Sequence, residues 1–340
     1  MTVRFGLLGA GRIGKVHARA ITSNRDAQLV AVSDAMADAA SSLAAEYGAE
    51  VRDTDAIIGS PDIDAVVICT PTDTHAALIE AAARAGKDIF CEKPVDLDVE
   101  RVKACLKVVD DHAATLMVGF NRRFDPHFEA LKDVIHRGEI GQVEMVTIVS
   151  RDPGAPPLEY VRRSGGIFRD MTIHDFDIAR WLLGEEIDTV SAQASVLVDP
   201  AIGEAGDYDS ASVMMTTASG KHATISNSRR ATYGYDQRIE VHGSKGSVAA
   251  ENQRPVSIEV ATASGYTRPP LHDFFMTRYT EAYAREISRF IEFAEADSAA
   301  VPSGIDGLMA LALAEAALRS VKEGRAVKVS EITGPLSGLG

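Results

Sequence analysis

The chain has 340 residues, of which 46% are hydrophobic, so it is long enough to bury more than one core. Its 49 acidic and 35 basic residues give a formal net charge of -14, which disfavours nucleic acid and anionic membranes as partners. Because the three cysteines form no C-x-x-C pair and no apolar run approaches about 20 residues, we expect a cytoplasmic protein without secretory leader, disulfides, membrane span or metal site.

The chain opens with a strand, a glycine-rich turn and a helix. Residues 3–8 predict a buried strand, and Gly9, Gly11 and Gly14 then form G-x-G-x-x-G before a helical pattern. In dinucleotide-binding folds the first glycine permits the tight turn, the second lets the backbone approach a pyrophosphate, and the third lets the helix pack on the strand. The opening segment therefore predicts a nucleotide site.

A second strand, at 28–33, ends at Asp34, which lies 20 residues after Gly14. This is the usual spacing of the carboxylate that accepts hydrogen bonds from the adenosine ribose. Asp34 would repel a 2'-phosphate, so the pattern favours NAD over NADP. In an alternative interpretation, Asp34 only caps the helix that follows.

Helix and strand alternate through the rest of the first half, as in a doubly wound parallel sheet of the Rossmann type. The predicted helices span about 39–47, 75–85 and 98–111, and the strands span 65–70, 88–92 and 115–120. Ligands bind at the carboxyl ends of such strands. The residues there include Thr70, Pro71, Glu92, Lys93, Asn121 and Arg122. Lys93 is a cation on the expected nicotinamide side, unless it is a solvated surface lysine.

After Phe124 the pattern changes to successive strands, which predict a large, mostly antiparallel, open sheet covered by helices. We expect a Rossmann domain over 1–122 and an α+β substrate-binding and oligomerisation domain over 123–340, whose C-terminal helices could pack back on the first domain. The strands are expected at 142–150, 189–198, 210–218, 221–231, 237–243 and 256–262, and the later helices at about 277–297 and 304–323. In the strand at 142–150, Val143, Met145, Thr147 and Val149 share one face and Glu144, Val146 and Ile148 the other. Both faces are largely apolar, which suggests helices on one and another subunit on the other.

The stretch GGIFRDMTIHDFDIARWLLG, at 165–184, predicts a helix over about 168–183. Met171, Ile178 and Leu182 form its packing stripe, while Asp170 and His174, at i and i+4, point together on a neighbouring face. An imidazole supported by a carboxylate is suited to moving a proton. The alternative is an aspartate that caps the helix and a histidine buried in the core.

Four motifs together carry a family resemblance: GAGRIG at 9–14, CTPTDTH at 69–75, CEKP at 91–94 and GGIFRDMTIHDFD at 165–177. Through them the chain resembles the glucose-fructose oxidoreductase / inositol dehydrogenase family, with a similar element order to about residue 330. The resemblance implies Lys93, Asp170 and His174 as catalytic residues, dissociable NAD, and a homotetramer built through the sheet of the second domain. The cofactor contacts that we expect come from Gly9, Ala10, Gly11, Arg12, Ile13, Gly14, Asp34, Thr70, Pro71, His75, Glu92 and Lys93.

The resemblance further implies oxidation of myo-inositol at its axial 2-hydroxyl to the 2-keto product, with His174 as general base. The expected substrate contacts are Lys93, Asn121, Arg122, Asp152, Asp170, His174, Tyr233 and Tyr235. Several of these have plainer alternatives: a surface cation at Arg122, an Asp-Pro-Gly turn at Asp152, and sheet packing for both tyrosines. Met171 stands where some inositol dehydrogenases have a threonine, which removes one expected substrate hydrogen bond.

Other functions remain open at this point. A dehydrogenase of scyllo-inositol, an aldose or a dihydrodiol would share the same motifs. A non-catalytic NAD-binding regulator would need none of the three catalytic residues. A zinc-dependent alcohol dehydrogenase would need clustered cysteine and histidine ligands, which the spacing does not provide.

Overall fold

The structure is a computed structural model that describes residues 2–296 and 301–335. The described residues form two compact units, one containing residues 2–124, 280–296 and 301–311 and the other Asp125–Tyr279 and Ala312–Gly334. The expected second domain spanned 123–340, with C-terminal helices that could pack back on the first domain, and in the structure α11 (Thr280–Ala296) groups with the first unit. No helix in the described part of the chain is both long enough and apolar enough to span a bilayer.

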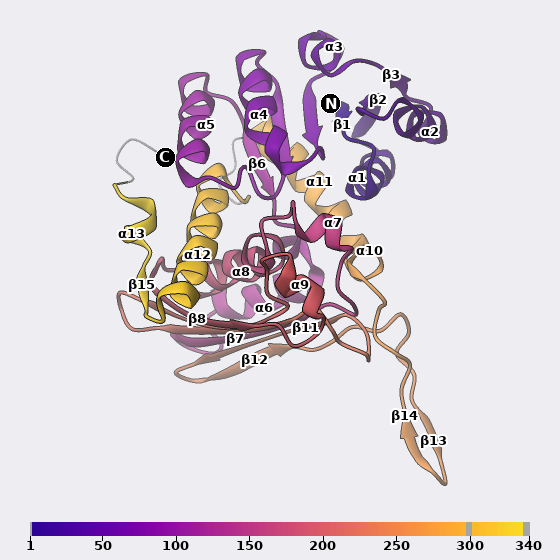
Figure 1. Cartoon of the computed structure of the whole chain (residues 1–340). Coiled ribbons are helices and arrows are strands. Elements are labelled where there is room, and N and C mark those ends of the chain that lie inside the picture. The colour runs from indigo at the N-terminus through magenta and orange to yellow at the C-terminus, as the bar shows by residue number, and fades with distance from the viewer. Residues whose placement is uncertain (1, 297–300, 336–340) are drawn as a thin grey trace. The chain divides into compact units, whose positions relative to one another are not determined.

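The first unit contains a six-stranded sheet in the order β3-β2-β1-β4-β5-β6, and its strand pairs are all parallel (Figure 1). This is the doubly wound order that the alternation of elements predicted, and it is confirmed. The four central strands β1, β2, β4 and β5 are largely apolar, as expected for a parallel sheet with helices on both faces, whereas the two residues of the edge strand β3 are exposed. The strands are β1 (Val3–Leu8), β2 (Ala27–Ser33), β3 (Glu50–Val51), β4 (Ala65–Ile68), β5 (Asp88–Glu92) and β6 (Leu116–Gly119).

The helices of the first unit follow the strands and carry their apolar faces inward. Asp98, for example, caps α5 by accepting from the N–H groups of Glu100 and Arg101. The helices are α1 (Arg12–Thr22), α2 (Ala37–Tyr47), α3 (Thr54–Gly59), α4 (His75–Arg84), α5 (Val99–Asp111) and α11, with 3-10 turns η1 (Thr72–Thr74) and η2 (Asn121–Phe124). The helix α12 (Gly304–Glu323) begins in the first unit and ends in the second.

The second unit contains a seven-stranded sheet in the order β12-β11-β7-β10-β9-β8-β15. Among the described strands of this sheet only β7 and β10 pair in parallel, so the mostly antiparallel prediction is confirmed. The strands are β7 (Val143–Arg151), β8 (Ile187–Ser195), β9 (Ser210–Thr217), β10 (His222–Ser228), β11 (Asp236–Gly243), β12 (Gly246–Ala250) and β15 (Val327–Lys328). The helices are α6 (Pro126–His136), α7 (Leu158–Val161), α8 (Ile173–Leu183), α9 (Pro200–Glu204), α10 (Phe275–Arg278) and α13 (Ser330–Thr333).

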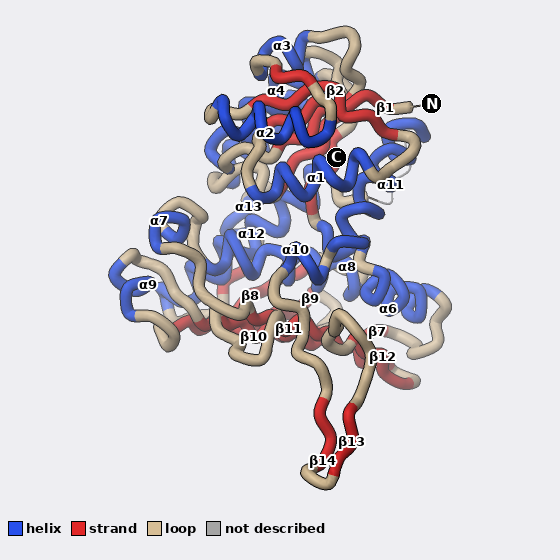
Figure 2. Tube along the Cα trace, turned by 90° about the vertical axis from the view of Figure 1, so that its right-hand side faces the viewer, coloured by secondary structure: helices blue, strands red, loops and turns tan. Residues whose placement is uncertain are grey.

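The two faces of this sheet differ in their environment. Helices α6 and α8 lie on one face (Figure 2). Val146 and Ile148 are buried on this side, whereas Met145 and Met214 are about half exposed on the other, at 48% and 52%. The expectation that Val143 shares a face with Met145 is wrong. A bulge shifts the register of β7 between these two positions and turns Val143 into the core.

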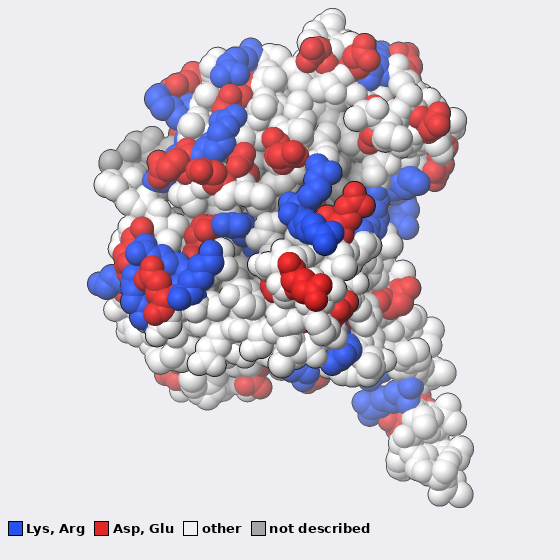
Figure 3. Space-filling view, in the orientation of Figure 1, with Lys and Arg blue, Asp and Glu red and all other residues white. Residues whose placement is uncertain are grey.

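A separate hairpin projects from the second unit (Figure 1). Its strands β13 (Val260–Thr262) and β14 (Gly265–Thr267) pair only with each other, so the expected sheet strand at 256–262 is wrong, and β12 forms the edge of the sheet instead. The alternating residues Val256, Ile258 and Val260 are all exposed. In Figure 3 the end of this hairpin shows a surface without charged side chains.

Candidate active site

In the glycine loop after β1, Gly11 faces open space that a pyrophosphate could occupy, whereas Gly9 and Gly14 are packed closely against the backbone. A Cβ on Gly9, which has a φ of +103°, would lie 2.6 Å from the Cys69 carbonyl, and one on Gly14 would lie 2.0 Å from the Gly9 oxygen. A Cβ on Gly11 would meet nothing within 4 Å. Gly11 is also the N-cap of α1 and offers no side-chain cap, so the helix N-terminus can face an anion. The space around the three glycines therefore fits the separate roles that the motif predicts.

The carboxylate of Asp34 is tied to this loop. It accepts from the N–H of Ala10 at 2.6 Å and from the N–H of Met36 at 2.8 Å. Met36, rather than Asp34, is the N-cap of α2, so the helix-capping alternative does not describe the contact. Each carboxylate oxygen has a further lone pair that can accept from a ribose hydroxyl. The loop and Asp34 thus fit NAD, whose nicotinamide supplies the hydride acceptor when bound.

Lys93 follows β5 directly and is half-buried. The side chains of two predicted cofactor contacts close to it are engaged within the protein. Glu92 pairs with His17 of α1 at 2.7 Å, and the two ring nitrogens of His75 lie 2.8 Å from the Pro94 oxygen and 2.7 Å from the Thr70 oxygen. These contacts bring the loops after β4 and β5 together at the carboxyl edge of the sheet.

Asp170 lies in a π-helical turn (Phe168–Thr172) that leads into α8. The expectation of one continuous α-helix over 168–183 is therefore wrong in its first turn. The hydroxyl oxygen of Thr172 lies 3.3 Å from the carbonyl oxygen of Ile167, five residues earlier. Such turns recur at functional sites because they redirect side chains. Within α8 every residue except His174 and Trp181 is buried, so His174 is the side chain of the first turn that a ligand can reach.

A buried polar network fixes α8 to the sheet. The amide of Asn227, on β10, donates to Asp175 at 2.8 Å and to the Ser150 carbonyl at 3.2 Å, and its oxygen accepts from Thr172 at 2.7 Å. Both Asp175 and Thr172 are fully buried, where satisfied hydrogen bonds are strong and their loss is costly. The network thus sets the rotation of the helix that carries His174.

The carboxylate of Asp170 has partners that the sequence did not indicate. It accepts from the hydroxyl of Tyr160 at 2.8 Å, and Arg229 lies 3.6 Å from it. The guanidinium of Arg229, only 1% exposed, also lies 3.5 Å from Asp207. Burial raises the pKa of Asp207, although backbone N–H groups and Arg229 act in the opposite direction. The cation therefore balances two carboxylates, of which one is the predicted catalytic residue.

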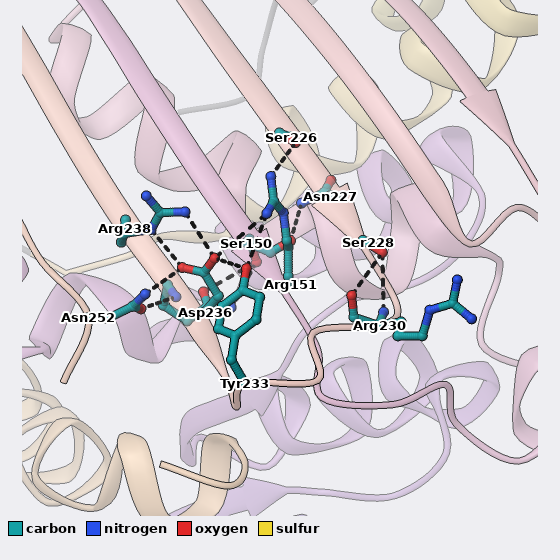
Figure 4. Close-up of polar contacts among 11 residues, drawn as sticks. Ser150, Arg151, Ser226, Asn227, Ser228, Arg230, Tyr233, Asp236, Arg238 and Asn252 are labelled. Atoms are coloured by element: carbon teal, nitrogen blue, oxygen red, sulfur yellow. Dashed lines mark hydrogen bonds and ion pairs between the residues drawn. The ribbon is translucent and has the colours of Figure 1, made fainter. Parts of the chain in front are cut away.

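Tyr233 and Tyr235 lie elsewhere in the second unit. Tyr233 donates to Asp236 at 2.6 Å, in a cluster with Arg151, Arg238 and Asn252 (Figure 4). Burial would raise the pKa of Asp236, but the hydrogen bonds from Arg238, Tyr233 and Asn252 outweigh burial and lower it.

The sheet separates this cluster from α8. Ile239 and Val241 of β11 are buried on the helix side, so Arg238 and Asp236 point to the open face. Tyr235 is buried against the rings of Phe274 and Tyr279. The structure therefore does not place the hydroxyl of Tyr233 beside Asp170.

The remaining candidates divide between the two units. Asn121 and Arg122 are buried in η2 of the first unit. Asp152 follows β7, and its N–H donates to the Ser228 carbonyl at 2.9 Å, next to Arg229. Because β7 and β10 are parallel, Asp152 and Arg229 emerge at the same edge of the sheet. No group of three or more histidine, cysteine, aspartate or glutamate side chains arranged to hold a metal occurs among the described residues.

Comparison with known proteins decides the family. Residues 3–120 match the oxidoreductase family with the NAD-binding Rossmann fold, and residues 128–249 match the GFO/IDH/MocA C-terminal domain. The chain belongs to the GFO/IDH/MocA oxidoreductase family. It is 72% identical over 330 residues to inositol 2-dehydrogenase of Rhizobium meliloti, covering 97% of this chain and 100% of that one.

Solved structures of the family agree with the fold. A myo-inositol dehydrogenase from Corynebacterium glutamicum superposes with a TM-score of 0.93 at 43% identity, over 96% of this chain and 99% of that one. A scyllo-inositol dehydrogenase from Lactobacillus casei, with NAD(H) and scyllo-inositol bound, gives 0.91 at 31% identity, over 97% and 100%. This member of the GFO/IDH/MocA family is an NAD-dependent dehydrogenase, as the motifs implied.

Proposed function

We propose that this dehydrogenase oxidises myo-inositol at its axial 2-hydroxyl to 2-keto-myo-inositol, with NAD as the hydride acceptor. The observation that carries the proposal is the 72% identity, over nearly the whole chain, to a protein named inositol 2-dehydrogenase. A second candidate substrate is scyllo-inositol, because the relative that binds it shares the fold at 31% identity.

In the proposed mechanism His174 takes the hydroxyl proton as hydride leaves the same carbon. A histidine suits this step because its ordinary pKa lies near working pH. Asp170 orients the imidazole and stabilises the imidazolium that forms. Arg229 and Tyr160 hold the Asp170 carboxylate in place.

Lys93 completes the proposed catalytic set. Its ammonium donates to the reacting oxygen and stabilises the negative charge that develops there. Lys93 belongs to the first unit and His174 to the second. In this proposal His174 removes the proton of the reacting hydroxyl and Lys93 stabilises the charge left on its oxygen.

The other substrate hydroxyls need polar partners, and a site that pairs with each of them discriminates strongly between polyols. We assign this role to Asn121, Arg122 and Asp152, which follow β6 and β7. Met171, where some inositol dehydrogenases have a threonine, is buried and packs in the core. A substrate contact by Tyr233 or Tyr235 stays untested, and their contacts with Asp236, Phe274 and Tyr279 favour a packing role for both.

The open face of the second sheet supports a homotetramer assembled through that sheet. The face exposes Met145 and Met214 among small polar side chains, which suits a contact with another subunit. We also place the protein in the cytoplasm, because its three cysteines are buried free thiols. Sedimentation of the wild type and of Met145→Lys tests the assembly, since a charge on the face should dissociate the oligomer.

The substrate is tested with a panel of inositols and aldohexoses, with NADH formation as the readout. We expect the highest kcat/KM for myo-inositol and a ketone at the carbon that bore the axial hydroxyl. Preference for scyllo-inositol would favour the second candidate. Turnover of an aldohexose but of no inositol would reject both, and NAD binding without turnover of any polyol would indicate a regulator.

A further inference from the structure

The residues on both sides of Lys93 each contact a buried histidine, and the two histidines come from different helices. On one side, His17 of α1 pairs with the carboxylate of Glu92 at 2.7 Å. On the other, His75 of α4 lies 2.8 Å from the carbonyl oxygen of Pro94. Neither histidine has a role in the mechanism proposed above.

The His17 contact lies in a dry interior. The His17 side chain is fully buried, its ring packs near Phe90 and Tyr283, and Glu92 is only 10% exposed. Glu286 of α11 is also fully buried, and neither of its carboxyl oxygens has a hydrogen-bond partner. Burial and the charge of Glu92 raise the pKa of Glu286 well above its usual value. A hydrogen bond in such surroundings is strong, so the link from α1 to Glu92 is stiff.

His75 joins two loops rather than one. Besides the Pro94 oxygen, its other ring nitrogen lies 2.7 Å from the Thr70 carbonyl oxygen. Both oxygens can only accept, so a neutral ring donates to one of them and an imidazolium to both. In either case the ring sits between the loop after β4 and the loop after β5, and it is 2% exposed. The Lys93 turn is thereby held against its neighbour on the sheet edge.

We propose that His17 and His75 are positioning residues for Lys93, fixing its backbone from both sides so that its ammonium reaches the reacting oxygen. A lysine carries its charge at the end of a flexible four-carbon side chain. The position of the ammonium therefore depends on how rigidly the backbone is held. A displacement of about 1 Å at a reacting centre can cost about 10²-fold in rate. The inference rests on the proposed function, in which Lys93 acts on the substrate oxygen.

Double-mutant cycles with Lys93→Met test the proposal in the full-length enzyme with NAD and myo-inositol. His17→Phe keeps a ring against Phe90 and Tyr283 but removes the N–H donor, and His17→Gln restores a donor. We expect His17→Phe to lower kcat about 10-fold with the Kd for NAD nearly unchanged, and His17→Gln to recover part of the loss. In the Lys93→Met background, His17→Phe should cost nothing further.

A second arm keeps the test valid if His17→Phe does not fold. His75→Gln, which keeps a donor for one carbonyl, is taken through the same cycle and should also lose its effect in the Lys93→Met background. His112→Phe, at an exposed histidine of the first unit, is the matched control and should leave kcat unchanged.

Three outcomes would overturn the inference. Equal losses with and without Lys93 would mean that the histidines act elsewhere, and a loss of NAD affinity at constant kcat would make them supports of the cofactor loop. Full activity of Lys93→Met would remove the proposed role of Lys93 itself, and the inference with it. This last result is distinct from the others because it is read from the single variant.

Discussion

Replacing Arg229 with methionine tests whether one buried cation supports the carboxylate edge of the site. Methionine has a similar length but no charge, so the change removes the partner of Asp170 and of Asp207 while filling most of the space. Breaking a buried ion pair by removing one partner costs about 3–5 kcal/mol. We expect the free energy of unfolding to fall by about 3 kcal/mol, the lower end of this range. Asp207 still accepts a hydrogen bond from the Ile167 N–H at 2.9 Å, and Asp170 is partly exposed.

The loss of unfolding free energy in Arg229→Met should depend on pH. Burial already raises the pKa of Asp207 above its unfolded value, and removing Arg229 raises it further. A carboxyl whose folded pKa is raised binds its proton more tightly in the folded state, so stability falls as pH rises through that pKa. The deficit of Arg229→Met relative to wild type should therefore be larger at pH 8 than at pH 5.

Urea unfolding, followed by the fluorescence of Trp181, measures this effect, because the single tryptophan lies on α8 in the same unit. Arg230→Met is the matched control. The guanidinium of Arg230 is exposed and donates to the carbonyl oxygens of Leu197 and Val198, at 3.2 and 3.5 Å, so we expect the free energy of unfolding to change by no more than about 0.5 kcal/mol. A loss below about 1 kcal/mol for Arg229→Met, or a deficit that shrinks as pH rises, would refute the reasoning.

Four further predictions follow from other parts of the structure. Gly11→Ala should leave the Tm unchanged, because a Cβ there meets nothing within 4 Å, but raise the KM for NAD at least about 10-fold; an unchanged KM would remove the loop from the cofactor site. His174→Ala should lower kcat at least about 10²-fold while the Kd for NAD is preserved, and full activity would end its assignment as the base. In the wild type, burial and the charge of Glu92 raise the pKa of Glu286, so its ionisation at high pH destabilises the folded state. Glu286→Gln should therefore make the free energy of unfolding fall less between about pH 6 and pH 9. An unchanged pH dependence in urea titrations would argue against this. Tyr233→Phe should cost about 1–2 kcal/mol by removing the hydrogen bond to Asp236 with the KM for myo-inositol unaltered, and a raised KM at constant stability would instead assign Tyr233 to the substrate.

Local patterns predicted the first unit well. Apart from the two-residue edge strand β3 and the short helix α3, which the sequence did not indicate, the strands are apolar runs such as 65–68 that alternate with helices. This pattern leaves few arrangements other than the doubly wound sheet. The second unit was harder because its strands pair over long sequence distances. The segment at 256–262 alternates like a sheet strand, yet β12, only a few residues earlier, takes the edge position.

The sequence predicted those parts of the candidate site that lie in short motifs. The glycine loop, Asp34 and the strand-end position of Lys93 are fixed by neighbouring residues in the chain, and the structure places them as expected. Arg229 and Asp207 were missed because nothing near Arg229 in sequence indicates that it is buried between two acids. A cation inside a predicted strand is the one available signal, since burial would require acidic partners.

The π turn before α8 has a consequence for how this region can change in evolution. A π turn contains one residue more than an α turn of the same span, so losing a residue between Ile167 and Thr172 would turn the segment into ordinary α-helix. Loss of Met171, for example, would place Arg169 four positions before His174, and the acid would rotate away by about a quarter turn or more. Related chains that keep both the carboxylate and the imidazole should therefore tolerate substitutions here but not changes of length.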